Sequence, residues 1–178
     1  VLIGTSHIYQ TAEERCPPQS AQDFQRFLSE ACRQYDIRTV AEEMNAEALA
    51  EVGRNESTPQ RGANELSLTH RFCDPDRGER NRLGLLQEND VKAKAFLNRI
   101  PDDEIARRIH DEYVKRERFW LERLRTVTNW PVLFICGANH VIRFGAILEA
   151  NGFSVRYIAD DWAPTPPAGE SRADLFSG

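Results

Sequence analysis

Short apolar runs alternate along the chain with longer segments whose apolar residues recur every three or four positions. The runs predict buried strands, and the spacing predicts amphipathic helices. The predicted strands cover residues 1–4, 37–43, 66–74, 132–136 and 153–159, and the predicted helices cover 20–35, 46–54, a short segment within 74–84, 90–127 and 141–151. This alternation of strands and helices predicts an α/β fold with a mostly parallel sheet flanked by helices.

Two segments are not expected to form helices or strands. Residues 53–66 are polar and contain glycine and proline, which predicts a mobile loop. Whether that loop closes over a site stays open. Residues 163–178 are proline-rich and are expected to form a C-terminal tail or a docked arm. Because 178 residues fit one domain, we expect a single α/β domain over 1–162.

Composition narrows the classes of partner. The formal net charge of −5 argues against a nucleic-acid surface, because phosphate binding needs a basic patch. No apolar run approaches the length of a membrane span. The four cysteines include no C-x-x-C pair, which favours reduced thiols in a cytoplasmic protein. The oligomeric state stays open, with a homodimer as one alternative.

The motif G-x-x-H follows two of the predicted strands. It occurs as "GTSH" ending at His7 and as "GANH" ending at His140. In a parallel sheet the carboxyl ends of the strands meet at one edge, where ligands bind. Glu42 and Glu43 end the second predicted strand, and Asp74 ends the third. We therefore expect His, Glu, Asp and His side chains along one active rim.

These side chains could support two kinds of chemistry, metal binding or general-base catalysis. Their spacing in the sequence does not distinguish the two. The imidazoles of His7 and His140, with one or two carboxylates, could hold a divalent manganese, cobalt, zinc or iron ion. Without a metal, a histidine could act as a general base oriented by a carboxylate. Gly4 and Gly137 would permit tight turns or let a ligand approach the backbone. Both glycines are therefore candidate ligand-binding positions.

Several neighbouring residues have a structural alternative. Strand alternation sends only one of Glu42 and Glu43 inward, so the other is expected at the surface. Asp74 lies in "DPD", which is also ordinary turn chemistry. Arg77, with Arg80 and Arg82, could bind an anion or form a solvated helix face; those three arginines stay candidates. Cys136 ends an apolar run, which favours a buried thiol over a nucleophile.

These residues together resemble the TraB/Tiki superfamily. "GTSH" and "GANH" are similar to its paired G-x-x-H motifs, and "VAEEMN" is similar to its glutamate motif, which matches Glu43 and places Asn45 where aspartate is common. "CDPDRGER" and "ERFWLERL" are similar to two further segments, the second of which singles out Arg118. The resemblance runs in order over about residues 1–158.

The resemblance implies a metal-dependent hydrolase or a close relative. In that superfamily the Tiki members are divalent-metal proteases, the erythromycin esterases use a histidine to activate water, and the ChaN-like members bind haem. It implies catalytic roles for His7, Glu43 and His140, as ligands of a divalent metal or as ligand and base. Arg118 would stabilise negative charge, and Asp74 would orient a histidine or complete the coordination. The expected reaction is hydrolysis of an amide or ester in a small-molecule or peptide substrate. The alternative is a non-catalytic module that binds a small molecule, haem or an anion at the same rim.

Overall fold

A parallel β-sheet organises the molecule. The computed structural model describes residues 1–165, and within them five strands form one sheet in the order β3-β2-β4-β1-β5, with every pairing parallel. The strands are β1 (Leu2–Thr5), β2 (Thr39–Glu42), β3 (Thr69–Phe72), β4 (Val132–Gly137) and β5 (Tyr157–Trp162). The predicted α/β class with a sheet flanked by helices is confirmed.

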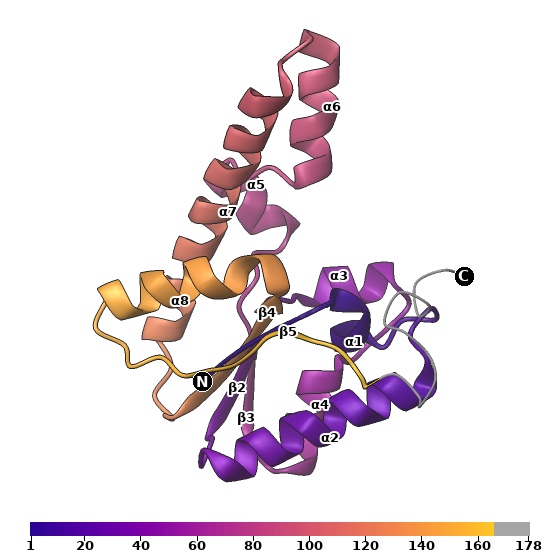
Figure 1. Ribbon diagram of the computed structural model, residues 1–178, viewed down its shortest axis with the longest axis vertical. Helices are drawn as coiled ribbons and strands as arrows, with labels where there is room; N and C mark the ends of the chain where they lie inside the picture. The colour runs from indigo at the N-terminus through magenta and orange to yellow at the C-terminus, as the bar shows by residue number, and fades with distance from the viewer. Residues whose placement is uncertain (166–178) are drawn as a thin grey trace.

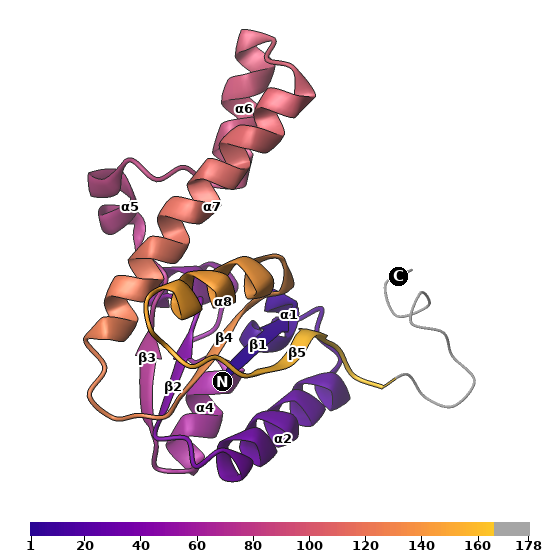
Figure 2. The same ribbon diagram turned by 60° about the vertical axis from the view of Figure 1, so that its left-hand side comes forward.

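Helices connect the strands and cover both faces of the sheet. They are α1 (His7–Thr11), α2 (Pro18–Gln34), α3 (Ala46–Glu51), α4 (Thr58–Glu65), α5 (Arg77–Leu83), α6 (Glu88–Asn98), α7 (Asp102–Arg125), the 3-10 turn η1 (Ala138–His140) and α8 (Val141–Ala150). Helices α2 and α4 lie on one face, while α8 and the C-terminal half of α7 lie on the other (Figures 1 and 2). Helices α5 and α6 and the rest of α7 project beyond the sheet.

Strand alternation divides the apolar side chains between two cores. Leu2 and Phe134 pack with Trp120 beneath α7 and α8, whereas the neighbouring Ile3 and Ile135 pack beneath α2. Because adjacent residues of a strand point to opposite faces, a strand buried on both faces reads as a continuous apolar run. This explains why "VLFIC" in β4 shows no alternation in sequence yet is buried at every position.

The segment expected as a loop, residues 53–66, contains helix α4, so that prediction is wrong. The Ser57 hydroxyl accepts a hydrogen bond from the Gln60 backbone N–H, which caps the helix, and Pro59 fits its first turn. Ala63 is buried in the core beneath α2. No residue of this segment lines the cleft described below, so α4 supports the sheet and is not a lid.

Other boundaries differ by a few residues. The last strand is β5, three or four residues later than expected, because Phe153 and Val155 pack against the α7–α8 core as part of a loop. The break expected at Pro101 separates α6 from α7. Of the tail expected at 163–178, residues 166–178 lie outside the described residues. Among those described, no helix is both long and apolar enough to cross a bilayer.

Candidate functional site

The order of the strands creates a cleft at their carboxyl ends. After β1 the chain turns toward the face covered by α2, whereas after the adjacent β4 it turns toward the face covered by α8. Loops that leave neighbouring strands in opposite directions open a crevice at the edge of a parallel sheet. A cleft of about 830 Å³ lies there, and His7, Glu43, Asp74 and His140 all line it. The expected convergence of these side chains on one rim is therefore observed.

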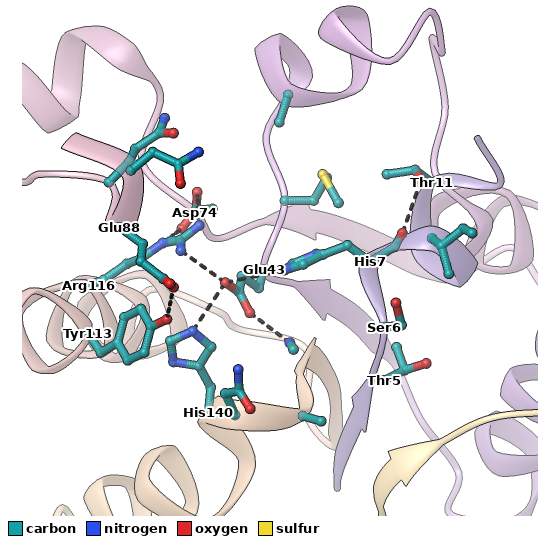
Figure 3. Close-up of a pocket in the computed structure, with 18 of the residues that line it drawn as sticks. Thr5, Ser6, His7, Thr11, Glu43, Asp74, Glu88, Tyr113, Arg116 and His140 are labelled. Atoms are coloured by element: carbon teal, nitrogen blue, oxygen red, sulfur yellow. Dashed lines mark hydrogen bonds and ion pairs between the residues drawn. The ribbon is translucent and has the colours of Figure 1, made fainter. Parts of the chain in front are cut away.

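The carboxylate of Glu43 lies at the centre of this group (Figure 3). Its Oε1 is 3.8 Å from His7 Nε2 and 3.5 Å from His140 Nε2. Its Oε2 accepts a 2.7 Å hydrogen bond from the backbone N–H of Gly137. The side chain is fully buried, and Oε1 has no hydrogen-bond partner among the described residues. The site thus presents one buried acceptor that faces both imidazoles.

Arg116 of α7 pairs with both carboxylates on the acidic side of the site. Its Nη1 lies 3.2 Å from Glu43 Oε1, and its Nε and Nη2 donate to the two oxygens of Asp74 at 2.5 and 2.7 Å. The Trp120 indole N–H also donates to Asp74, at 3.0 Å. Burial lowers the pKa of the Arg116 guanidinium, but the charges of Glu43 and Asp74 outweigh burial and raise that pKa above its ordinary value. Arg116 therefore stays charged and fixes the Glu43 carboxylate.

His140 is held rigidly from the other side. Its Nδ1 lies 2.6 Å from Oε1 of Glu117, a fully buried carboxylate that Arg143 also binds at 2.5 and 2.7 Å. Rings of Tyr113 and Trp120 contact the imidazole edge-on, with centroids 4.7 and 4.9 Å away. Since the Glu117 carboxylate only accepts, Nδ1 donates its proton there and Nε2 faces Glu43. That contact with Glu43 is attractive when Nε2 also carries a proton.

His7 has a looser environment. It is the first residue of α1, and 52% of its side chain is exposed, compared with 6% for His140. Apart from Glu43, its imidazole has no hydrogen-bond or ion-pair partner within residues 1–165. A separation of 3.8 Å from Glu43 is too long for a direct hydrogen bond and suits a bridging water.

The two motif glycines serve different purposes. A Cβ on Gly4 would lie 1.9 Å from the Asp160 carbonyl oxygen and 2.3 Å from Val141 Cγ2. Gly4 thus allows β1 and β5 to approach, and it does not line the cleft. A Cβ on Gly137 would lie 3.4 Å from both Glu43 Oε2 and His7 Nε2. Gly137 therefore borders the site as expected, whereas the ligand-binding role expected for Gly4 is not supported.

Two predicted arginines lie elsewhere. Arg118 is exposed and does not line the cleft, because on α7 it lies about 200° around the helix from Arg116. Arg116 occupies the position expected for Arg118. Arg77 is exposed, pairs with Glu51 at 3.1 Å and also lies outside the cleft. Both expected roles are therefore corrected.

The expectation that Glu42 or Glu43 lies at the surface is also wrong, since both are buried. Glu42 points away from the cleft and bonds His70 Nε2 at 2.8 Å and the Ser57 hydroxyl. His70 is therefore a structural histidine. The two glutamates have different polar partners: Glu42 contacts Ser57 and His70, whereas Glu43 contacts the two motif histidines and Arg116. Only Glu43 belongs to the site.

Sequence reasoning missed Arg116, Glu117 and Arg143. A signal existed for the first two, because Tyr113 and Trp120 lie seven positions apart on one helical face, and residues three and four positions after Tyr113 share that face. Two charged residues inside an apolar stripe indicate buried polar contacts. Arg143, which follows "GANH" by three residues, has no comparable signal.

Cys136, next to Gly137, is fully buried beneath α7 and α8. Burial raises its pKa well above the ordinary value, and the nearby charges of Glu43 and Glu117 raise it further. The thiol therefore stays protonated near neutral pH. This agrees with a buried thiol and not with a nucleophile.

The geometry of His7, Glu43 and His140 does not favour a bound divalent ion. The donor types suit such an ion, and Glu117 behind His140 is typical of metal-binding histidines. However, no three His, Cys, Asp or Glu side chains in residues 1–165 are arranged as a metal site, and the Arg116 guanidinium approaches the same Glu43 oxygen. In this arrangement the residues do not fit the ion. Metal binding stays a prediction, and no step below depends on it.

Comparisons of the chain with protein-family models, with curated proteins and with solved structures give no significant match. The resemblance to the TraB/Tiki superfamily therefore stays a prediction.

Proposed function

We propose that this protein hydrolyses amide or ester bonds, with a water molecule activated between His7 and Glu43. The observation that supports the proposal is the position of one buried carboxylate oxygen, Glu43 Oε1, between the Nε2 atoms of two histidines in an open cleft. One of these histidines is half-exposed, and the other is held by Glu117. Such a difference in environment suits one base and one acid.

The first step is attack by water. His7 Nε2 takes one proton of a water molecule while the other hydrogen is donated to Glu43 Oε1. The water oxygen forms a bond to the substrate carbonyl carbon, and the carbonyl π pair moves to its oxygen. The charge of Arg116 stabilises this oxyanion electrostatically. The role expected for Arg118 thus passes to Arg116.

The second step breaks the ester or amide bond. His140 enters the reaction as an imidazolium, with its Nδ1 proton donated to Glu117 and a second proton on Nε2. The oxyanion pair reforms the carbonyl, the bond to the leaving oxygen or nitrogen breaks, and the leaving group takes the proton from His140 Nε2. Glu117 and Arg143 keep the His140 ring in position. His7 then releases its proton to solvent, which its exposure permits, and His140 takes one up. The site returns to its starting state without a net change.

A substrate panel tests the proposal. Wild-type protein, His7→Ala and His7→Gln are assayed on chromogenic esters and on short peptides, and bound metal is measured in protein purified without added metal. The proposal predicts turnover that falls at least ~100-fold in both variants, because general acid–base catalysis contributes about 10² to 10⁴. Unchanged turnover in His7→Ala would remove this histidine from the mechanism. Stoichiometric metal lost in His7→Ala would restore the metal-dependent version.

The second candidate, a binding module, is separated by the same panel. Stoichiometric binding of a small molecule or anion with no turnover of any ester or peptide would favour it. Haem binding would appear as a Soret band after reconstitution.

A further inference from the structure

Arg80 is the basis of an inference about the substrate, and it rests on the proposed function. Helix α5 contributes three arginines with different surroundings. Arg77 is paired with Glu51 outside the cleft, and Arg82 is exposed and also outside it. Arg80 is partly buried and lines the same cleft as His7 and His140. The structure thus separates one arginine of α5 from the other two.

Among the residues that the structure describes, Arg80 is the unpaired arginine of the cleft. Within residues 1–165, three arginines line it, and two already have carboxylate partners: Arg15 pairs with Glu13, and Arg116 pairs with Glu43 and Asp74. The Arg80 guanidinium has no ion-pair or hydrogen-bond partner among the described residues. A guanidinium lining a cleft without a partner suits a bidentate contact with a bound carboxylate.

Three glutamates of the cleft pair with other cations and not with Arg80. Glu51, Glu88 and Glu112 line the cleft but pair with Arg77, Lys92 and Lys115, respectively. These pairs leave Arg80 free for a ligand. The rim keeps a negative charge because Glu43 and Asp74 share the single positive charge of Arg116. One free cation among several carboxylates suits a group with a single negative charge and disfavours a phosphate dianion.

Apolar side chains lie beside Arg80. Leu85 and Leu86 follow α5 directly and line the cleft, and the Leu85 N–H donates to the Arg80 carbonyl at 2.9 Å. Met44 and Val52 line it as well. A cleft of about 830 Å³ is large enough for a ligand with several carbons between the scissile bond and the charged group. These features describe an amphiphilic ligand.

We propose that Arg80 binds a free carboxylate of the substrate, so that the preferred substrates are esters or amides with one carboxylate at the end of a short apolar chain. Arg80 is then a specificity-determining residue remote from the bond that is hydrolysed. Its charge would also stabilise the C-terminal turn of α5, a purely structural role that Arg82 shares. Arg82→Gln is therefore the matched control for Arg80→Gln.

The test compares two esters that differ in one charge. Mono-4-nitrophenyl glutarate has a free carboxylate, and its methyl ester does not. Wild-type protein and Arg82→Gln should prefer the free acid by about tenfold or more in kcat/KM, the effect of one charge-assisted hydrogen bond. Arg80→Gln should lose the preference through a higher KM for the free acid. Equal rates for both esters in wild type, or equal losses in both variants, would overturn the assignment.

Two further measurements distinguish a carboxylate site from a phosphate site, and a failed subsite from a failed function. A 4-nitrophenyl ester that ends in phosphate should be a poor substrate, and a preference for it would contradict a monocarboxylate site. If no ester is hydrolysed, the proposed function fails, and Arg80 is then tested by NMR titration with monomethyl glutarate. Saturable binding lost in Arg80→Gln but kept in Arg82→Gln would support the subsite without turnover. Absence of binding would overturn it.

Discussion

The two G-x-x-H motifs, "GTSH" and "GANH", have the same spacing but different surroundings. His7 is half-exposed at the start of a short helix, whereas His140 is buried between two aromatic rings with its Nδ1 bound to Glu117. Gly4 allows two strands to approach, whereas Gly137 donates its N–H to the shared Glu43. Equal motifs therefore do not imply equal roles. In the mechanism that we propose, one motif would supply a solvent-accessible base, and the other would supply a fixed acid.

The largest expected effect is on turnover. His140→Ala should lower kcat/KM by roughly 10³-fold and His7→Ala by at least ~100-fold, because each loss removes one proton-transfer group. The comparison is made on the best substrate of the panel, with folding checked by circular dichroism. If imidazole added to the buffer rescues only His7→Ala, the difference in accessibility is supported. Rescue of both variants to the same extent would contradict it.

Substitution of the two motif glycines should affect stability and turnover differently. Gly4→Ala should lower the free energy of unfolding by about 3 kcal/mol or prevent folding, since its Cβ would collide with backbone. Gly137→Ala should cost within about 1 kcal/mol, because its Cβ would make van der Waals contact with Glu43 and His7 at 3.4 Å, yet it should reduce turnover because the methyl group takes space that the bridging water needs. Urea unfolding and the ester assay measure both. Equal unfolding midpoints for the two variants would contradict these assignments.

The histidines should also differ in their effect on stability. His140→Ala leaves Glu117 without one buried partner and opens space between Tyr113 and Trp120, which should cost about 2–3 kcal/mol. His7→Ala should change the unfolding free energy by less than about 0.5 kcal/mol, as expected for an exposed side chain. Thermal or urea unfolding measures the difference. Equal losses would show that the two environments are alike.

The smallest effect concerns the thiol before the second motif. Burial raises the pKa of Cys73 to about 12 and that of Cys136 well above its ordinary value, whereas unfolded thiols ionise near pH 8.5. The folded state therefore retains protons that the unfolded state loses, so this stabilisation is complete below about pH 8.5 and declines as the pH rises toward the folded values. At pH 9.0 each thiol should cost about 0.8 kcal/mol relative to pH 7.5.

Unfolding of wild type and Cys136→Ala at the two pH values measures this cost. The variant should show the smaller decline, and its turnover should remain within about threefold of wild type because the thiol takes no part in the reaction. A turnover loss comparable to that of His140→Ala would contradict the assignment of Cys136 as structural.

Much of the fold could be predicted from sequence, because strands buried on both faces are continuous apolar runs and the helices have a clear apolar periodicity. Helix α4 could not be predicted in this way, because the segment is mostly polar and only one side of the helix packs against the core. Its capping serine and first-turn proline were the available signals. The end of β4 was predicted within one residue because Gly137 follows the apolar run directly.

The site was predictable where strand ends fix a residue, as for His7, Glu43, Asp74 and His140. It was not predictable where a residue reaches the cleft from a long helix. Arg116 rather than Arg118 faces the site because a two-residue step rotates a side chain about 200° around the helix axis. The partnership of Glu117 with Arg143 joins α7 to α8, and no local pattern encodes such a contact between separate helices.

The most direct measurement of the central claim is kcat/KM of Glu43→Gln beside its control, Glu42→Gln. Both glutamates are fully buried and adjacent in sequence, but only Glu43 lies between the two imidazoles. On the best substrate of the panel, we predict a loss of at least ~100-fold for Glu43→Gln and less than about tenfold for folded Glu42→Gln. Wild-type turnover in a folded Glu43→Gln protein would contradict the account.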